Sequence, residues 1–253
     1  MNDSPMRRYP LSDRFLLHAD EGRRGRRVRH LAGTSDRRRE LLDRIGSAAV
    51  AVGGTRLLRS GTWAWPDLPP DALAEQLRAD RTELADLSIV AAACPRQHGR
   101  ARLSLLCRQG PIDVVVKLGL PDDGLENETA ALRILTESPL PGIATPRVIA
   151  SGRLDAGGPI AYLATDALGL DGQRPAIGES LTTFESDLAT RLHALPRPPG
   201  TAHDAVPLHG DLAPWNLRRT DRGLALFDWE AAGWGRAGSD IEYYRTCCAE
   251  LRS

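Results

Sequence analysis

The feature that most constrains this chain is a polar loop between apolar flanks in its C-terminal part. Residues 208–216 read Leu-His-Gly-Asp-Leu-Ala-Pro-Trp-Asn. A short apolar run follows and ends in the acid Asp228, with Trp229 and Glu230 directly after it. Charged and neutral oxygen atoms therefore come from three side chains: the acid Asp211, the amide Asn216 five residues later, and the acid Asp228 at the end of the run. Such a set suits a hydroxyl group and a hard divalent cation.

A second unusual feature is the basic composition. Of the 33 lysine and arginine residues, Lys117 is the sole lysine. Lysine is a compact point charge on a flexible stem, whereas arginine is a planar fork. In this arginine-rich background a lone lysine indicates a position that arginine could not serve. The alternative is a solvated cation at the end of a strand.

Length and overall charge set broad bounds on the chain. At 253 residues it can form one large domain or two lobes. A net charge of zero does not favour binding to nucleic acid or to an anionic membrane. The cysteines form no C-x-x-C pair and no apolar run could span a bilayer, which argues against a disulfide framework, a zinc site and a membrane protein. No apolar leader follows the first arginines, so we expect a cytoplasmic protein.

Residues 1–85 form an arginine-rich N-terminal extension, which we expect to be partly helical and partly disordered. Arginines crowd residues 23–39. We interpret them as a solvated basic arm, with a docking site for a protein partner as the open alternative. Helical spacing of apolar residues predicts a helix over residues 37–52, and Asp71 as a cap indicates a short helix over residues 72–79.

From residue 87 the pattern changes to strands separated by turns. Residues 87–93, 101–108 and 112–118 read as three successive strands. Alternation along the third strand places Val116 and Lys117 on opposite faces. The later elements are expected in this order: a helix over 122–136, strands over 147–151 and 159–165, a connector over 169–178, a helix over 179–195, a hairpin through 220–223 and a helix over 240–251.

This order of elements resembles the protein-kinase-like fold. The H-G-D-x-x-x-x-N loop with its downstream D-W-E is similar to the aminoglycoside phosphotransferase (APH) family of small-molecule kinases, whereas protein kinases carry H-R-D and D-F-G. The resemblance covers roughly residues 87–245. It implies an α+β, two-lobed fold that follows the N-terminal extension. Residues 86–168 would be a small β-rich N-lobe, and residues 169–253 a short, mainly helical C-lobe with the catalytic loop.

The same resemblance implies an activity. The chain would be an ATP-dependent phosphotransferase that moves the ATP γ-phosphate to an alcohol group of a small molecule, with Mg²⁺ as cofactor. Asp211 would be the catalytic base, and Asn216 and Asp228 the metal ligands. The open alternative is a catalytically weak or inactive nucleotide-binding regulatory or scaffold protein on the same fold, and a protein kinase is a weaker third option.

The remaining site residues are also implied by the resemblance. Lys117 would bind the ATP phosphates and pair with Glu128, with Glu126 as the alternative partner. The residues expected around the adenine are Thr165, Asp166 and Ala167. Three residues would support the site from behind: His209 orienting the loop, Glu230 near the metal ligands and Asp240 bracing the loop.

Two departures from the family pattern concern substrate binding. The loop over residues 95–100 reads Pro-Arg-Gln-His-Gly-Arg and is not glycine-rich. The chain also continues for only thirteen residues after Asp240, where the family has helices that build the acceptor pocket. The acceptor therefore stays open among aminoglycosides, sugars, amino alcohols and other antibiotics.

Overall fold

The chain divides into two units in this computed structural model: Met1–Asp122 with Ile149–Ala167, and Asp123–Val148 with Leu168–Ser253. The structure describes residues 6–9, 15–18, 58, 61, 63, 65–94, 102–168 and 173–251. The helix expected over residues 37–52, the arginine-rich stretch and the loop over residues 95–100 lie outside these ranges.

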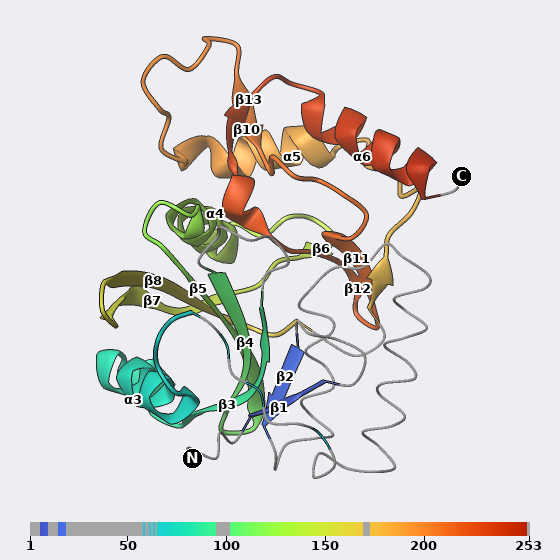
Figure 1. Cartoon of the computed structure of the whole chain (residues 1–253). Helices are drawn as coiled ribbons and strands as arrows, with labels where there is room; N and C mark the ends of the chain where they lie inside the picture. The colour runs from blue at the N-terminus through green and yellow to red at the C-terminus, as the bar shows by residue number, and fades with distance from the viewer. Residues whose placement is uncertain are drawn as a thin grey trace. The chain divides into compact units, whose positions relative to one another are not determined.

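The first unit is built on a seven-stranded sheet with the order β1-β2-β3-β4-β5-β8-β7 (Figure 1). Every neighbouring pair from β1 to β8 is antiparallel. The strands are β1 Met6–Arg8, β2 Phe15–His18, β3 Leu87–Ala93, β4 Arg102–Gln109, β5 Ile112–Gly119, β7 Val148–Asp155 and β8 Pro159–Asp166. The strands expected from residue 87 onward are confirmed. The sequence reading missed β1 and β2, which join the sheet through β3.

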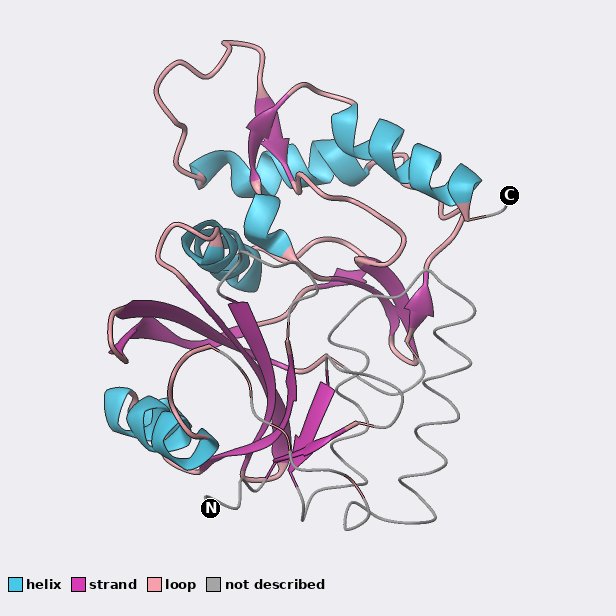
Figure 2. Ribbon diagram, viewed as in Figure 1, coloured by secondary structure: helices cyan, strands magenta, loops and turns pink. Residues whose placement is uncertain are grey.

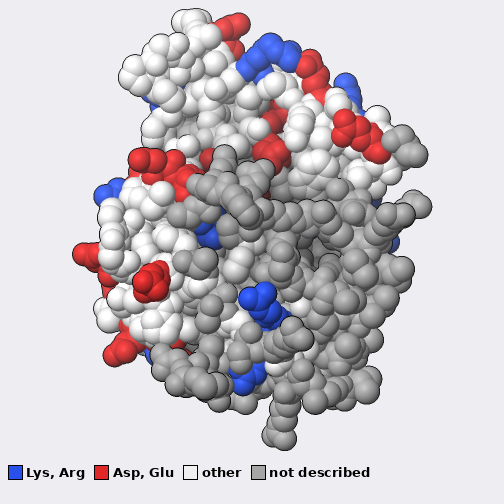
Figure 3. Space-filling model, in the orientation of Figure 1, with Lys and Arg blue, Asp and Glu red and all other residues white. Residues whose placement is uncertain are grey.

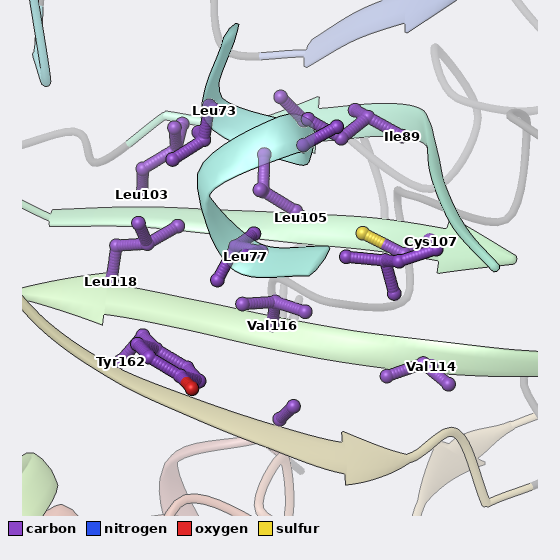
Figure 4. Packing of buried hydrophobic residues seen from close by; sticks show 14 of the residues in the cluster. Leu73, Leu77, Ile89, Leu103, Leu105, Cys107, Val114, Val116, Leu118 and Tyr162 are labelled. Carbon is purple, nitrogen blue, oxygen red and sulfur yellow. The ribbon is translucent and has the colours of Figure 1, made fainter. Parts of the chain in front are cut away.

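Helix α3 (Pro70–Asp80) covers one face of this sheet and is followed by the 3-10 helix η2 (Thr82–Leu84). Helix α3 begins at Pro70. Proline is tolerated in the first turn because a backbone N–H there has no hydrogen-bond partner within the helix. Leu73 and Leu77 are fully buried and belong to the same apolar cluster as Leu105 and Val116 (Figure 4). Burial alternates along β5 as expected, because Val116 is fully buried whereas Lys117 is only half-buried.

Polar contacts fix the end of α3 to the sheet. The buried Tyr162 on β8 donates its hydroxyl hydrogen to the Asp80 carboxylate. Burial and, next, this hydrogen bond raise the pKa of Tyr162. The Arg81 guanidinium donates to the Ser151 carbonyl on β7 from Nε at 3.3 Å and from Nη2 at 3.2 Å. The helix from the first 85 residues is thus an integral part of the sheet unit.

The second unit combines helices with two small sheets (Figure 2). Its helices are α4 Leu125–Glu137, α5 Phe184–Arg191 and α6 Ser239–Glu250, with the 3-10 helices η3 Leu192–Ala194 and η4 Trp229–Ala231. One sheet has the order β6-β12-β11-β9, with β6 Ile143–Ala144, β9 Arg174–Pro175, β11 Leu217–Thr220 and β12 Gly223–Leu226. The other pairs β10 Val206–Leu208 with β13 Gly233–Gly235.

The α+β class expected from the sequence is confirmed, with two differences in detail. Helix α4 groups with the second unit rather than with the sheet. Helix α5 begins at Phe184, although the apolar spacing predicted a start at Glu179. The Tyr244 hydroxyl explains this later start, because it accepts the Glu179 N–H at 3.0 Å and donates to the Ala176 carbonyl at 2.7 Å. These bonds hold the preceding segment out of the helix.

The described helices also bear on membrane insertion. None of them combines the length and the apolar composition that a membrane-spanning helix requires.

Replacing a buried leucine of α3 tests whether this helix belongs to the core. We expect Leu77→Ala to lower the free energy of unfolding by about 2–5 kcal/mol, because it leaves a cavity in a fully buried position. Glu75→Ala on the exposed side of the same helix should change it by less than about 0.5 kcal/mol. Urea unfolding of the two variants measures this. Equal effects would show that α3 does not pack on the sheet.

Candidate active site

A buried carboxylate holds the polar loop in place. Asp240, in the first turn of α6, is 3% exposed. Its Oδ2 accepts the His209 N–H at 2.7 Å and its Oδ1 accepts the Gly210 N–H at 3.0 Å. Burial raises the pKa of Asp240, while these two N–H groups lower it. Hydrogen bonds to a charged acceptor are strong, so this carboxylate ties α6 to the start of the loop.

His209 has both ring nitrogens engaged inside the loop. The ring is fully buried, with Nε2 3.0 Å from the Phe227 carbonyl oxygen. Nδ1 accepts the Asp211 N–H at 3.2 Å. A carbonyl oxygen can only accept, so these partners assign the neutral tautomer with hydrogen on Nε2. The edge of the ring also packs against Trp229, with centroids 4.6 Å apart. This imidazole orients the loop and has no nitrogen left for a substrate.

Asp211 and Asn216 are brought together by the turn of the loop. The Asn216 amide nitrogen Nδ2 donates to the Asp211 backbone oxygen and to its Oδ2, both at 2.9 Å. Asn216 is 4% exposed. Because Nδ2 points at Asp211, the amide oxygen of Asn216 keeps its lone pairs for another group. No described residue donates to this oxygen.

Asp228 reaches the same place through an unusual backbone conformation. Among the described residues it is the only one other than glycine with a positive φ, at φ 65° and ψ 63°. Aspartate tolerates this left-handed region better than most residues, at a cost of about 1–2 kcal/mol. Burial is the main cause that raises the pKa of Asp211, and the charge of Asp228 is the next. The Phe227 N–H donates to the Asn216 carbonyl at 3.0 Å, so the strand end that carries Asp228 lies beside Asn216.

The turn that carries Trp229 and Glu230 packs against the polar loop and against the start of α4. Gly210 has φ 83°, and a Cβ there would lie 2.1 Å from the Ala231 carbonyl oxygen. Gly124, before α4, has φ 84°, and its Cβ would lie 2.8 Å from the Glu230 carbonyl oxygen. Only glycine fits these two positions. The glycine in H-G-D therefore has a packing reason.

The donor set suits magnesium when a nucleotide supplies the remaining ligands. In the described ranges no three His, Cys, Asp or Glu side chains gather as a cage for a metal ion. Asn216 offers a neutral oxygen and Asp228 an anionic one, both of the hard kind that Mg²⁺ prefers. Mg²⁺ usually keeps waters and takes phosphate oxygens in addition to one or two protein ligands. A cation here would also relieve the repulsion between Asp211 and Asp228.

Arg218 on β11 is a site neighbour that the sequence reading missed. The side chain is 8% exposed, and its Nε donates to the Trp215 carbonyl at 2.6 Å. Its Nη1 donates to Gln173 Oε1 at 2.8 Å, and its guanidinium lies over the Phe227 ring at 4.9 Å. Burial lowers its pKa to about 10, and the charge of Asp228 opposes that shift. Its position two residues after Asn216 was the one available signal.

Tyr243 on α6 is the second residue that the sequence reading missed. Its ring is 42% exposed. Its hydroxyl opposes the rise in the pKa of Asp211 that burial causes. Burial, followed by the charge of Asp211, raises the pKa of Tyr243 to about 12. The available signal was its place three residues after Asp240, on the same face of a helix.

The candidate phosphate-binding residues fall in different units. Lys117 lies on β5, where it pairs with Ser104 on β4 and Leu163 on β8. Glu128 lies in the first turn of α4 and is 3% exposed, whereas Glu126 is exposed. A buried acid is rare unless it has a partner, so burial favours Glu128 over Glu126 as a functional acid.

The residues expected around the adenine lie at the end of β8. Thr165 is buried, and Asp166 ends the strand opposite Val114 on β5. The Ala167 N–H donates to the Asp113 carbonyl at 3.1 Å. That N–H is therefore already in use, which leaves the carbonyl of Ala167 as its backbone group for a ligand.

Part of the chain is similar in sequence to a known protein family. Residues 166–244 match the family model described as the APH phosphotransferase enzyme family, which confirms the resemblance over a span that contains the whole loop, Asp228 and Asp240. No curated protein sequence matches the chain.

Similar solved structures include three phosphotransferases. Spectinomycin phosphotransferase with ADP and spectinomycin is 10% identical, with a TM-score of 0.47 over 70% of this chain and 74% of that one. Aminoglycoside-3′-phosphotransferase of type VIII is 20% identical, with a TM-score of 0.41 over 70% and 88%. A GDP complex of a variant aminoglycoside 2′-phosphotransferase IIIa is 14% identical, with a TM-score of 0.46 over 70% and 78%.

Two glycines with almost equal φ test the packing of the loop. Gly200 has φ 80° and nothing within 4 Å of the position that a Cβ would take, whereas the Cβ of Gly210 would overlap the Ala231 carbonyl. We expect Gly200→Ala to cost about 1–2 kcal/mol of stability from the backbone alone. Gly210→Ala should cost about 1–3 kcal/mol more because of the overlap. Thermal or urea unfolding measures both, and equal losses would contradict the close contact.

The carboxylate of Asp240 gives a test that depends on pH. We expect Asp240→Asn to destabilise the fold by about 1–3 kcal/mol, because the amide nitrogen cannot accept the second loop N–H. The raised folded-state pKa means that Asp240 contributes most below its ordinary pKa of 3.8, and that this contribution falls as pH rises through the folded-state pKa. Asparagine does not titrate. Asp240→Asn should therefore lower the free energy of unfolding more at about pH 4 than at about pH 7. A larger loss at about pH 7 would contradict the raised pKa of Asp240.

Proposed function

We propose that this protein is an ATP- and Mg²⁺-dependent phosphotransferase that acts on a hydroxyl group of a small molecule. The observation that carries the proposal is the convergence of Asp211, Asn216 and Asp228 on one loop and one strand end. The family match over residues 166–244 supports it. Electrostatic stabilisation and positioning supply most of the catalysis in phosphoryl transfer, and this donor set suits both tasks.

Asp211 acts as the base for the acceptor hydroxyl. Its Oδ2 receives the Asn216 amide hydrogen at 2.9 Å, which fixes the carboxylate plane. The other oxygen is then the one that takes the hydroxyl proton as the new bond between oxygen and the γ-phosphorus forms. The bond from the γ-phosphorus to the bridging oxygen breaks, and ADP leaves with that oxygen.

Asn216 and Asp228 hold the divalent cation. When bound, Mg²⁺ supplies positive charge to the phosphate oxygens and so favours the departure of ADP. Asn216 keeps its amide oxygen toward the cation because its Nδ2 is occupied by Asp211. Arg218 lies near Asp228 and stacks on Phe227, so it limits the movement of the strand end.

The remaining residues position the nucleotide and the loop. Lys117 is the expected phosphate ligand, as a flexible point charge, and the buried Glu128 is the acid expected to act with it. Thr165, Asp166 and Ala167 contact the adenine through backbone groups other than the Ala167 N–H. Three further side chains support the loop and the metal ligands: His209, Glu230 and Asp240.

Replacing the base while keeping its shape tests the proposal. We expect Asp211→Asn to reduce phosphate transfer to a panel of hydroxyl compounds by about 10²–10⁴-fold, because the amide cannot take a proton. Binding of ATP, measured by the shift in melting temperature, should be retained. Mass spectrometry of the compounds measures transfer.

The matched control is Asp221→Asn, at an exposed hairpin turn, which should transfer phosphate at the unaltered rate. Equal rates for the Asp211 variant and the unaltered protein would refute the catalytic assignment. ATP-dependent stabilisation without transfer by either protein would instead support a nucleotide-binding regulatory role.

A further inference from the structure

Arg218 is the only arginine or lysine that is buried in the described ranges. Basic side chains are mostly exposed in proteins, and Figure 3 shows such side chains in blue on the visible face of the molecule. The next residue on β11, Arg219, is exposed and places its Nη2 2.6 Å from Glu179 Oε1. Taking a guanidinium out of water is costly, so the burial of Arg218 indicates a task for its planar fork.

The Arg218 side chain contacts the residue before each of the two proposed metal ligands. Its Nε donates to the carbonyl of Trp215, the residue before Asn216, at 2.6 Å. Its guanidinium carbon lies 4.9 Å from the centre of the Phe227 ring, and Phe227 precedes Asp228. Both contacts come from one planar group of fixed shape. Arg218 therefore links the two chain segments that carry the proposed ligands.

The backbone joins the same two segments. The hairpin of β11 and β12 brings the start of one strand beside the end of the other. The Phe227 N–H donates to the Asn216 carbonyl at 3.0 Å. Asp228 follows in the left-handed conformation and is no longer extended. Arg218 therefore reinforces the hairpin at the end where both proposed ligands lie.

Gln173 holds another nitrogen of the guanidinium. Its Oε1 accepts a hydrogen bond from Arg218 Nη1 at 2.8 Å, and its own amide nitrogen donates to the Leu168 carbonyl at 2.8 Å. The guanidinium is thus bound both by Gln173 and by the Trp215 carbonyl. Hydrogen bonds of this kind lock a side chain in one orientation, which lets it position its neighbours.

A rigid pair of oxygen ligands favours a small cation over a large one. Mg²⁺ requires near-ideal octahedral geometry at about 2.0–2.1 Å, whereas Ca²⁺ accepts flexible geometry at about 2.3–2.6 Å. A side chain that limits the separation of the Asn216 and Asp228 oxygens therefore affects Mg²⁺ more than Ca²⁺. A fixed charge near the site, by contrast, acts equally on both divalent cations.

We propose that Arg218 is a positioning residue that makes the metal site selective for Mg²⁺ over Ca²⁺. It acts through Trp215 and Phe227, because a guanidinium has no lone pair to offer a cation. The inference rests on the proposed function, which makes Asn216 and Asp228 the metal ligands. Arg218 holds these two residues at the separation that Mg²⁺ requires.

Competition between metal ions tests this inference without measuring turnover. Mn²⁺ suits the same oxygen ligands as Mg²⁺, and the relaxation of water protons reports how much Mn²⁺ is bound to the full-length protein in the presence of ADP. Adding Mg²⁺ or Ca²⁺ displaces the Mn²⁺, which gives the affinity of the protein for each of these two ions.

We expect Arg218→Met to weaken Mg²⁺ binding about 10–100-fold, the usual effect of removing a residue that orients a metal ligand. Ca²⁺ binding should weaken less than about threefold, because Ca²⁺ tolerates a flexible site. Arg218→Lys keeps the charge but cannot contact Trp215, Gln173 and Phe227 together, so it should also weaken Mg²⁺ more than Ca²⁺. Gln173→Met retains the arginine and should weaken Mg²⁺ by less than about tenfold.

The matched control is Arg219→Met, which removes the same charge from the next residue of the same strand. It should leave the affinities for Mg²⁺ and Ca²⁺ unchanged. Melting temperatures measured without metal show whether each variant is folded. If Arg218→Met does not fold, Arg218→Lys and Gln173→Met decide the question.

The ratio of the two affinities decides the inference. A selective loss of Mg²⁺ affinity in the Arg218 variants would support it. Equal changes for Mg²⁺ and Ca²⁺, in either direction, would leave Arg218 with only a charge or folding effect. Equal changes or unchanged affinities, in variants whose parent protein transfers phosphate, would overturn the inference and keep the enzyme.

Two further results concern the proposed function. Asp228→Asn should weaken the binding of both ions, and unchanged binding of both would refute Asp228 as a metal ligand and with it the inference. A selective loss of Mg²⁺ affinity in the Arg218 variants, without phosphate transfer by the unaltered protein, would support the positioning role and refute the enzyme.

Discussion

The candidate site depends on one buried negative charge. The Asp240 carboxylate accepts the N–H groups of His209 and Gly210 and so sets where the loop begins. From there the hydrogen bonds continue, because His209 accepts the Asp211 N–H and also binds the Phe227 carbonyl before Asp228. An isolated buried carboxylate would be costly. The two N–H partners offset part of the loss of water, and burial still leaves the pKa of Asp240 raised. One helix residue thereby orders both the proposed base and the strand end that carries the proposed metal ligand.

Much of the architecture was predictable because its signals are local. The strands from Leu87 to Gly119 alternate in polarity and are separated by turn residues, so neighbouring residues suffice to define them. For α3 the local signal is Asp71, an acid in its first turn. The acid and the amide of the loop were predictable for a different reason. A polar motif of fixed spacing between apolar flanks has few structural uses, and the motif agreed with the element order around it.

The remaining features depend on contacts that a single sequence does not display. Strands β1 and β2 are short and form because β3 offers an edge. The start of α5 is set by a hydroxyl from Tyr244, sixty-five residues further along the chain. Arg218 and Tyr243 belong to no motif, and each acquires its place only when the loop and α6 are assembled. For the same reason, burial favours Glu128 over Glu126, whereas spacing left both open.

The two glycines that face η4 have a mechanical consequence. Gly124 and Gly210 bring the start of α4 and the polar loop against the same short turn, without side chains between the backbones. Close-packed protein interiors have low compressibility, so a displacement on one side of such a contact is transmitted to the other side. A shift of α4, which carries Glu128, would therefore be passed through η4 to Asp211. Residues far from the chemistry could in this way alter the alignment of the loop.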